Sequence, residues 1–156
     1  MSVPDTEKSR IVVGVDGSPH SVAALRWTLR QAVLTGAPVE AVACWHAPAM
    51  VGAYAPVAYV DIDLSEPTGD VARAALADAV AATPGATDVT VDVRVAQGYP
   101  AMLLLEAAEG ADLLVVGSRG HGELSGMLLG SVGLHCATHA PCPVLIVHDQ
   151  ANKASA

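Results

Sequence analysis

A glycine-rich segment in the last third of the chain has the spacing with the clearest chemical meaning. It reads Gly117-x2-Gly120-x9-Gly130-Ser131 and contains five glycines before the start of a predicted helix. Glycines allow a backbone to approach a ligand closely. Free N–H groups at a helix N-terminus attract phosphate through hydrogen bonds and the helix dipole. We therefore predict that this segment binds the phosphates of a nucleotide.

Two observations bear on that prediction. A surface turn would have a similar composition, but a predicted strand before the segment and a helix after it favour the binding interpretation. The chain has no G-x-x-x-x-G-K-(S/T), so a phosphate-binding lysine of the P-loop kind is absent. We expect no catalytic residue and at most slow hydrolysis of the nucleotide.

Asp16 follows the first apolar run of the chain and is the second candidate for ligand binding. In doubly wound sheets, ligands bind beyond the carboxyl ends of the strands, where the strand order reverses. Asp-Gly is also common turn chemistry, so Asp16 could act only as a turn residue before Ser18. Its position at the end of a strand favours the ligand role.

The elements that must position these residues alternate along the chain. β-Branched and apolar runs predict strands, and three- and four-residue apolar spacing predicts helices. The predicted strands cover 11–15, 39–45, 89–95, 113–116 and 144–147, and the predicted helices cover 19–35, 70–82, 102–109 and 131–139. This order indicates an α/β fold: a doubly wound, five-stranded parallel sheet, Rossmann-like, with helices on both faces.

We expect a single domain over residues 10–148, with flexible tails at 1–9 and 149–156. Residues 46–65 contain prolines, a glycine and two tyrosines without a clear period. Such a long excursion is unusual in a compact domain unless it serves a ligand or a partner.

Charge and composition exclude several classes of partner. The net charge is −8 and the eight basic residues are scattered, so a nucleic acid or an anionic membrane would be repelled. No apolar run approaches the roughly 20 residues of a membrane-spanning helix, and the N-terminal stretch has no apolar core typical of a secretion signal. Three cysteines without a C-x-x-C pair indicate free thiols in a reducing compartment, so we expect a cytoplasmic location.

The segment His135-Cys136-x2-His139-x2-Cys142 carries residue types that bind metals. On a helix packed against a sheet, however, Cys136 is expected to face inward while the two histidines face outward. We therefore expect no metal site.

The glycine spacing resembles the G-x2-G-x9-G-(S/T) pattern of the nucleotide-binding branch of the universal stress protein family. The stretch 14–18 is similar to the end of that family's first strand, 98–100 resembles its G-x-P turn, and 141–147 resembles its terminal strand. The resemblance covers roughly residues 10–148.

This resemblance implies which residues hold the nucleotide. Asp16 lies near the ribose and adenine, and the backbone around Cys44 bonds the adenine edge. Residues 116–117 flank the ribose and first phosphates, and residues 119–120 and 130–132 surround the phosphate chain, with magnesium offsetting its charge. The implied site residues are Gly14, Val15, Asp16, Cys44, Val116, Gly117, Arg119, Gly120, Gly130, Ser131 and Val132. The side chain of Arg119 could contact phosphate or point to solvent.

The family's sheet order, 3-2-1-4-5, implies that residues 144–147 form an edge strand with unpaired backbone groups. Such an edge favours a homodimer through this strand. The function we expect is that of an ATP-binding regulatory protein of the stress response, a switch without significant turnover. A slow ATPase, a cyclic-nucleotide-binding module and an interaction protein with an empty loop remain as alternatives.

Overall fold

The computed structural model describes residues 9–46, 63–120 and 128–149. Its centre is a five-stranded parallel sheet in the order β3-β2-β1-β4-β5, which confirms the predicted fold class and strand order. The strands are β1 (Ile11–Gly14), β2 (Val39–Trp45), β3 (Val91–Gln97), β4 (Leu113–Gly117) and β5 (Val144–Val147). The helices are α1 (Pro19–Thr35), α2 (Ser65–Ala81), the short 3-10 helix η1 (Ala86–Asp88), α3 (Pro100–Ala107) and α4 (Ser131–His139).

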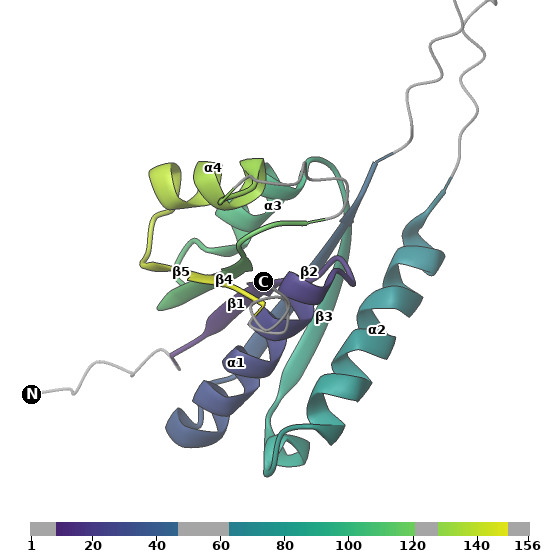
Figure 1. Cartoon of the computed structure of the whole chain (residues 1–156), viewed down its shortest axis with the longest axis vertical. Coiled ribbons are helices and arrows are strands. Elements are labelled where there is room, and N and C mark those ends of the chain that lie inside the picture. Colours follow the sequence, from purple (N-terminus) through teal and green to yellow (C-terminus); the bar gives the residue numbers. More distant parts are fainter. Residues whose placement is uncertain (1–8, 47–62, 121–127, 150–156) are drawn as a thin grey trace, which may run out of the picture.

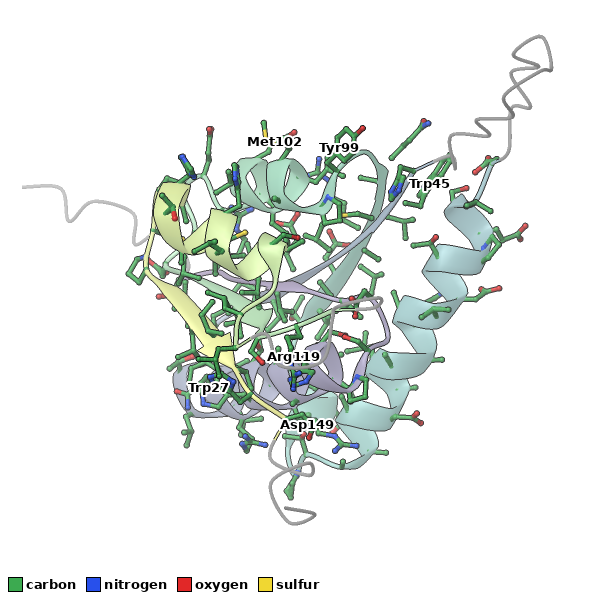
Figure 2. All side chains as sticks on the ribbon, turned by 45° about the horizontal axis from the view of Figure 1, so that its top comes forward. Trp27, Trp45, Tyr99, Met102, Arg119 and Asp149 are labelled. Carbon is green, nitrogen blue, oxygen red and sulfur yellow. The ribbon has the colours of Figure 1, made fainter. Side chains whose placement is uncertain are left out.

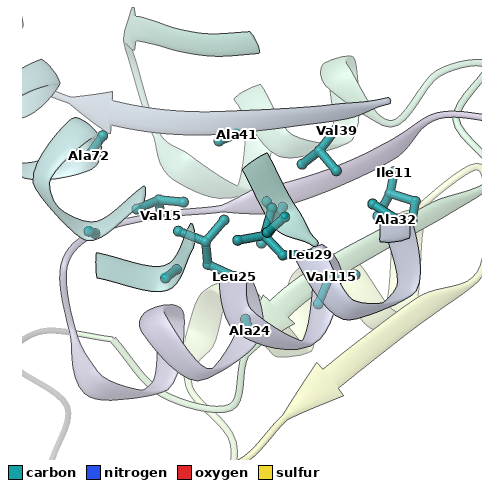
Figure 3. Packing of buried hydrophobic residues seen from close by; sticks show 14 of the residues in the cluster. Ile11, Val15, Ala24, Leu25, Leu29, Ala32, Val39, Ala41, Ala72 and Val115 are labelled. Atoms are coloured by element: carbon teal, nitrogen blue, oxygen red, sulfur yellow. The ribbon is translucent and has the colours of Figure 1, made fainter. Parts of the chain in front are cut away.

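Helices cover both faces of the sheet, as Figure 1 shows: α1 and α2 pack on one face, and α3 and α4 pack on the other. The larger cluster lies under α1 and α2 and includes Leu25, Leu29, Val13 and Val115, none of which is exposed to solvent (Figure 3). Full burial of a side chain of this size contributes about 1.5–3 kcal/mol. The two layers therefore fix the sheet from both sides.

Helix α1 begins and ends where its local sequence predicts. The Ser18 hydroxyl accepts a hydrogen bond from the Ser21 N–H, Pro19 is the first helical residue, and Gly36 ends the helix at φ 73°. The buried face of α1 does not consist of apolar residues alone. Thr28 is fully buried with its hydroxyl bonded to the Ala24 carbonyl, whereas Val33 is 40% exposed.

Helix α2 begins at Ser65, five residues before the predicted start at Asp70. Pro67 lies in the first turn, where a helix makes no use of its N–H groups and tolerates proline. The Thr68 N–H donates to the Leu64 carbonyl at 3.1 Å and closes this first turn. Residues 47–62, most of the predicted excursion, lie outside the described residues.

Two further boundaries are shifted by turns that periodicity does not reveal. Strand β3 starts at Val91 rather than Val89, because η1 ends with a bond from the Val89 N–H to the Ala86 carbonyl. Helix α3 starts at Pro100 rather than Met102, since proline is suited to the first helical position. Over the described ranges, none of the helices combines the length and apolar character required to cross a membrane.

Candidate functional site

A pocket of about 360 Å³ lies at the carboxyl ends of β1, β2 and β4. This is the edge of a doubly wound sheet where the strand order reverses, and the usual place for a ligand. All eleven residues singled out from the sequence line it: Gly14, Val15, Asp16, Cys44, Val116, Gly117, Arg119, Gly120, Gly130, Ser131 and Val132. The fold thus brings together residues from three strands, two loops and the first turn of α4.

Seven further residues line the same pocket: Ser21, Val42, His46, Pro100, Leu104, Ser118 and Gly133. Val42 could have been found, because side chains two apart on a strand share a face and Cys44 was already a candidate. Pro100 and Leu104 could not, because only the packing of α3 over β1 and β2 brings them to this edge.

One wall of the pocket is apolar and belongs to the core under α3 and α4. It combines Val42, Leu104 and Val116 with the thiol of Cys44. Burial raises the pKa of Cys44 to about 11, and the nearby Arg94 charge only partly opposes that rise. The thiol is therefore neutral at physiological pH and acts as a small apolar group.

The rim beside this wall carries two aromatic rings. The rings of His46, at the end of β2, and Tyr99, before α3, stack with centroids 5.9 Å apart. Tyr99 is 72% exposed and lies at the N-terminal end of α3 (Figure 2). No sequence signal pointed to His46, because we assigned it to the start of the irregular 46–65 segment.

Asp16 forms the turn that the sequence suggested and also lies at the pocket. Its Oδ1 accepts a hydrogen bond from the Ser18 N–H at 2.8 Å, which is the geometry of an Asx turn. The same residue is exposed and lines the pocket. The turn therefore holds the carboxylate at the pocket, where its role in ligand binding stays a prediction.

The N-terminus of α4 opens into the pocket. Ser131, Val132 and Gly133 are its first three residues, and all of them line the pocket. The first intrahelical bond runs from the Leu134 N–H to the Gly130 carbonyl, and no side chain of the described residues caps this end. By contrast, α1 is capped by Ser18. The first N–H groups of α4 are thus available to an anion.

Two pocket glycines are also required by packing. A Cβ on Gly117 would lie 2.7 Å from the carbonyl carbon of His20, so β4 and α1 meet without space for a side chain. A Cβ on Gly133 would lie 2.8 Å from Leu129 Cδ1 and 3.6 Å from Ile146 Cδ1. This contact explains a glycine inside a helix, where it costs about 1 kcal/mol relative to alanine.

Comparison with known proteins gives this architecture a family. The Universal stress protein family model matches residues 8–148, nearly the whole chain. The chain belongs to the universal stress protein family. A universal stress protein of Mycolicibacterium smegmatis is 38% identical over 138 residues, covering 88% of this chain and 45% of that protein. One of Mycobacterium tuberculosis strain H37Rv is 31% identical over 150 residues, covering 90% and 48%. The chain spans about half the length of these curated relatives.

Solved structures agree on the fold. A universal stress protein in complex with cAMP is 29% identical to this chain, with a TM-score of 0.68 and coverage of 92% of this chain and 98% of that one. Universal stress protein UspA from Lactobacillus plantarum is 22% identical, with a TM-score of 0.62 and coverage of 92% and 99%. The second likeness supports the fold alone.

In this member of the universal stress protein family, Arg119 lines the pocket and is half-exposed (Figure 2). A contact between its side chain and phosphate, one of the two alternatives given by the sequence, stays a prediction. Residues 121–127 of the glycine-rich segment and the two tyrosines of the 46–65 excursion lie outside the described residues.

The candidate metal-binding segment on α4 has the orientation expected of a packed helix. Cys136 is fully buried, whereas His139 is exposed and its ring stacks on that of His135 with centroids 4.5 Å apart. Burial raises the pKa of Cys136 to about 11 and also raises that of Cys142. Across the described parts of the chain, no three His, Cys, Asp or Glu side chains gather closely enough to hold a metal ion.

Proposed function

We propose that this protein binds ATP in the pocket and acts as a nucleotide-dependent regulatory module of the stress response. The observation that carries the proposal is the N-terminus of α4, which lies in the pocket wall without a side-chain cap from the described residues. Three successive N–H groups and the positive end of the helix dipole there suit a phosphate group. The glycines at 117, 120 and 130 leave the adjoining backbone open to close approach.

The end of β2 suits the adenine base. The Val15 N–H donates to the Val42 carbonyl at 2.9 Å, and β1 itself ends at Gly14 while β2 continues to Trp45. Backbone groups of alternate residues on a parallel strand point to the same side. The N–H and C=O of Cys44 therefore point past the end of β1, toward the pocket, where they can bond the edge of a base.

Family members of known structure support the choice of an adenine nucleotide. The universal stress protein that is 29% identical to this chain was solved in complex with cAMP. A universal stress protein from Archaeoglobus fulgidus was solved in complex with dAMP, and a family member from Arabidopsis thaliana was solved with AMP bound. Adenine is common to all three ligands, whereas the phosphate part varies. A cyclic nucleotide is accordingly the second candidate ligand.

A magnesium ion would fit beside the phosphates. Asp16 is the carboxylate among the described residues of the pocket wall, and it is exposed at the rim. Magnesium in nucleotide sites is held by one or two carboxylates together with phosphate oxygens and water. Asp16 would supply the protein oxygen, and the ion would offset the repulsion between its carboxylate and the phosphates.

The described wall contains no lysine, and its fixed charges are Asp16 and Arg119. Phosphoryl transfer depends on positioned cations and on a group that orients the nucleophile. We therefore propose that the protein retains ATP rather than hydrolysing it, so that occupancy of the pocket is the signal.

Titration calorimetry with ATP, AMP and cAMP, each with and without magnesium, tests the ligand. We expect ATP with magnesium to bind most tightly and the release of inorganic phosphate to stay at the level of a blank. Absence of binding by all three nucleotides would refute the proposal. Tighter binding of cAMP would favour the second candidate.

We also propose a homodimer formed through β5. This strand is one edge of the sheet and carries no charge, and its four side chains are partly exposed. Antiparallel pairing with a second copy would satisfy its unpaired backbone groups and produce the two-fold symmetry that is commonest among oligomers. Sedimentation of the purified protein as a monomer at micromolar concentration would contradict this proposal.

A further inference from the structure

His20 is a buried histidine that does not line the pocket but contacts the segments around it. It is the second residue of α1 and only 8% exposed. Its Nδ1 accepts a hydrogen bond from the Asp149 N–H at 3.0 Å and lies 3.1 Å from the Ser118 hydroxyl oxygen. One ring nitrogen thus joins the start of α1, the loop after β4 and the residue two beyond β5.

These contacts determine the tautomer of the ring. A backbone N–H can only donate, so Nδ1 must carry a lone pair and the neutral ring has its proton on Nε2. The Ser118 hydroxyl is then a donor as well, and it shares the single lone pair of Nδ1 with the Asp149 N–H in a three-centre hydrogen bond. His20 therefore acts here as a hydrogen-bond acceptor.

Ser118 connects both ends of the glycine-rich loop to the sheet. Its carbonyl accepts from the Gly130 N–H at 2.7 Å, and its own N–H donates to the Val147 carbonyl at 2.8 Å. It is 1% exposed and lies between Gly117 and Arg119, two residues of the pocket wall. A shift of Ser118 would thus move the loop, the first turn of α4 and the end of β5 together.

We propose that His20 is a positioning residue: through Ser118 it holds the pocket loop in its binding geometry and couples that loop to the chain segment that follows β5. Asp149, labelled in Figure 2, lies just beyond β5 and inside the tail that we predicted from residue 149 onward. The consequence for ligand affinity rests on the proposed function. The hydrogen bonds from Ser118 and Asp149 to His20 can themselves be measured in the protein without nucleotide.

The expected effect follows from preorganisation. A loop held before binding does not lose that freedom when the ligand arrives. Loss of one buried hydrogen-bond acceptor is worth roughly a tenfold change in an equilibrium constant. Coupling is reciprocal, so nucleotide should in turn slow the opening of the Asp149 hydrogen bond.

Two substitutions of nearly equal size separate the effect of losing the hydrogen-bond acceptor from the effect of losing the volume of the ring. In His20→Asn the amide Oδ1 occupies the same position along the side chain as Nδ1 and can accept from Asp149. His20→Leu has nearly the shape of asparagine but no acceptor, so it leaves the Ser118 hydroxyl and the Asp149 N–H without their partner. Ser118→Ala removes only the hydroxyl and keeps both backbone bonds.

The first measurement is amide hydrogen exchange of Asp149 and Gly130 in the protein without nucleotide, together with proton–nitrogen correlation spectra of the His20 ring. We expect an Nε2-protonated ring, exchange in His20→Asn within about threefold of wild type, and exchange at least roughly tenfold faster in His20→Leu. Equal exchange rates in the two variants, or a proton on Nδ1, would refute the role of His20 as hydrogen-bond acceptor for Ser118 and Asp149, whether or not a ligand binds.

The second measurement is ATP affinity by calorimetry. We expect His20→Leu and Ser118→Ala to bind roughly tenfold more weakly and His20→Asn to bind nearly as wild type does. If wild type binds ATP and all three variants bind equally well, the positioning role is wrong. If wild type binds no nucleotide at all, the proposed function fails, and the exchange data still decide whether His20 holds Ser118 and Asp149.

Discussion

A Cβ placed on Gly120 would lie 2.8 Å from Oδ2 of Asp16, so the carboxylate occupies the space directly in front of the glycine-rich loop. The two residues are more than a hundred positions apart in the chain and come from the ends of β1 and β4. The pocket is therefore bounded on one side by backbone and on the other by a carboxylate. The absence of a side chain at position 120 is what permits this approach.

Gly120→Ala should weaken ATP binding at least tenfold. The added methyl group would displace the Asp16 carboxylate and narrow the approach to the loop, and a separation of 2.8 Å leaves no alternative to movement. Gly120 does not have a positive φ, so alanine there introduces no backbone strain. The circular dichroism spectrum should match wild type, and calorimetry should give the affinity.

The double variant Asp16→Ala with Gly120→Ala is the matched control, because it removes the carboxylate that the methyl group meets. If the added Cβ acts through Asp16, Gly120→Ala should cost little further affinity in the Asp16→Ala background. Wild-type affinity in the single variant Gly120→Ala would contradict the role given to this contact.

Gly117→Ala should instead damage the fold. Its Cβ would lie 2.7 to 2.9 Å from the carbonyl carbon, the carbonyl oxygen and the Cβ of His20, none of which can rotate away. Overpacking of this kind typically costs roughly 1–3 kcal/mol. At about 2–4 °C per kcal/mol for a protein of this size, the melting temperature should fall by several degrees.

Gly69→Ala is the control for Gly117→Ala. Gly69 is buried, but the nearest atoms to its Cβ would be those of the Arg73 guanidinium group, the far end of a flexible side chain. Alanine in α2 should therefore leave stability unchanged or raise it by up to about 1 kcal/mol. Equal melting temperatures for Gly117→Ala and wild type would show that α1 can move away from β4.

Stability should decline at alkaline pH because the fold shields two thiols, Cys44 and Cys136, from water. The pKa values of Cys44 and Cys136 are raised from 9.0 to about 11, chiefly by burial. In the unfolded chain these thiols ionise near pH 9, so their stabilising contribution is complete below that pH and is lost as the pH rises toward 11. Denaturant titrations under reducing conditions should show this decline.

The variant Cys44→Ala with Cys136→Ala separates the thiols from the lysines and tyrosines, which titrate in both proteins. Its unfolding free energy should fall less steeply than that of wild type between about pH 9 and about pH 11. Parallel curves over that interval would show that thiol ionisation does not contribute.

The proposed dimer can be tested at the backbone of β5. Leu145 and Val147 pack against the cluster on the α1 side, to which Trp27 also belongs, whereas Val144 and Ile146 pack on the α4 side. No side chain of this strand points along the sheet toward a partner. A lysine at 145 or 146 would therefore disturb the protein's own core as well as a dimer.

Val144→Pro is the sharper variant. The Val147 and Pro143 carbonyls accept from β4, so alternation directs the backbone groups of Val144 toward the free edge. Proline there removes one outward-facing donor and keeps the bonds to β4. Sedimentation should show a weaker dimer and an unchanged fold. Leu145→Pro, which removes a donor facing β4, should instead lower stability, and an unaltered dimer in Val144→Pro would argue against pairing through this edge.

Local sequence signals were sufficient to predict the ends of several helices and strands and most of the pocket residues. The bounds of β2, α4 and β5 match the predicted ones. Glycine or proline lies just before each of these elements and marks where it begins. The glycine spacing from 117 to 131 and Asp16 after the first strand, together with the family resemblance, were enough to select eleven pocket residues. Strand ends in a doubly wound sheet must meet at one edge, so position in the sequence already implies proximity.

What faces these residues depends on how the elements pack together. His20 and Asp149 are 129 positions apart, and the bond between them requires α1 to lie beside β5. Leu104 and Pro100 reach the pocket because α3 crosses the ends of β1 and β2, and Gly133 is small because Leu129 and Ile146 fill the space around it. Such contacts are set by distances of closest approach between elements. Periodicity and turn chemistry describe each element separately and do not contain those distances.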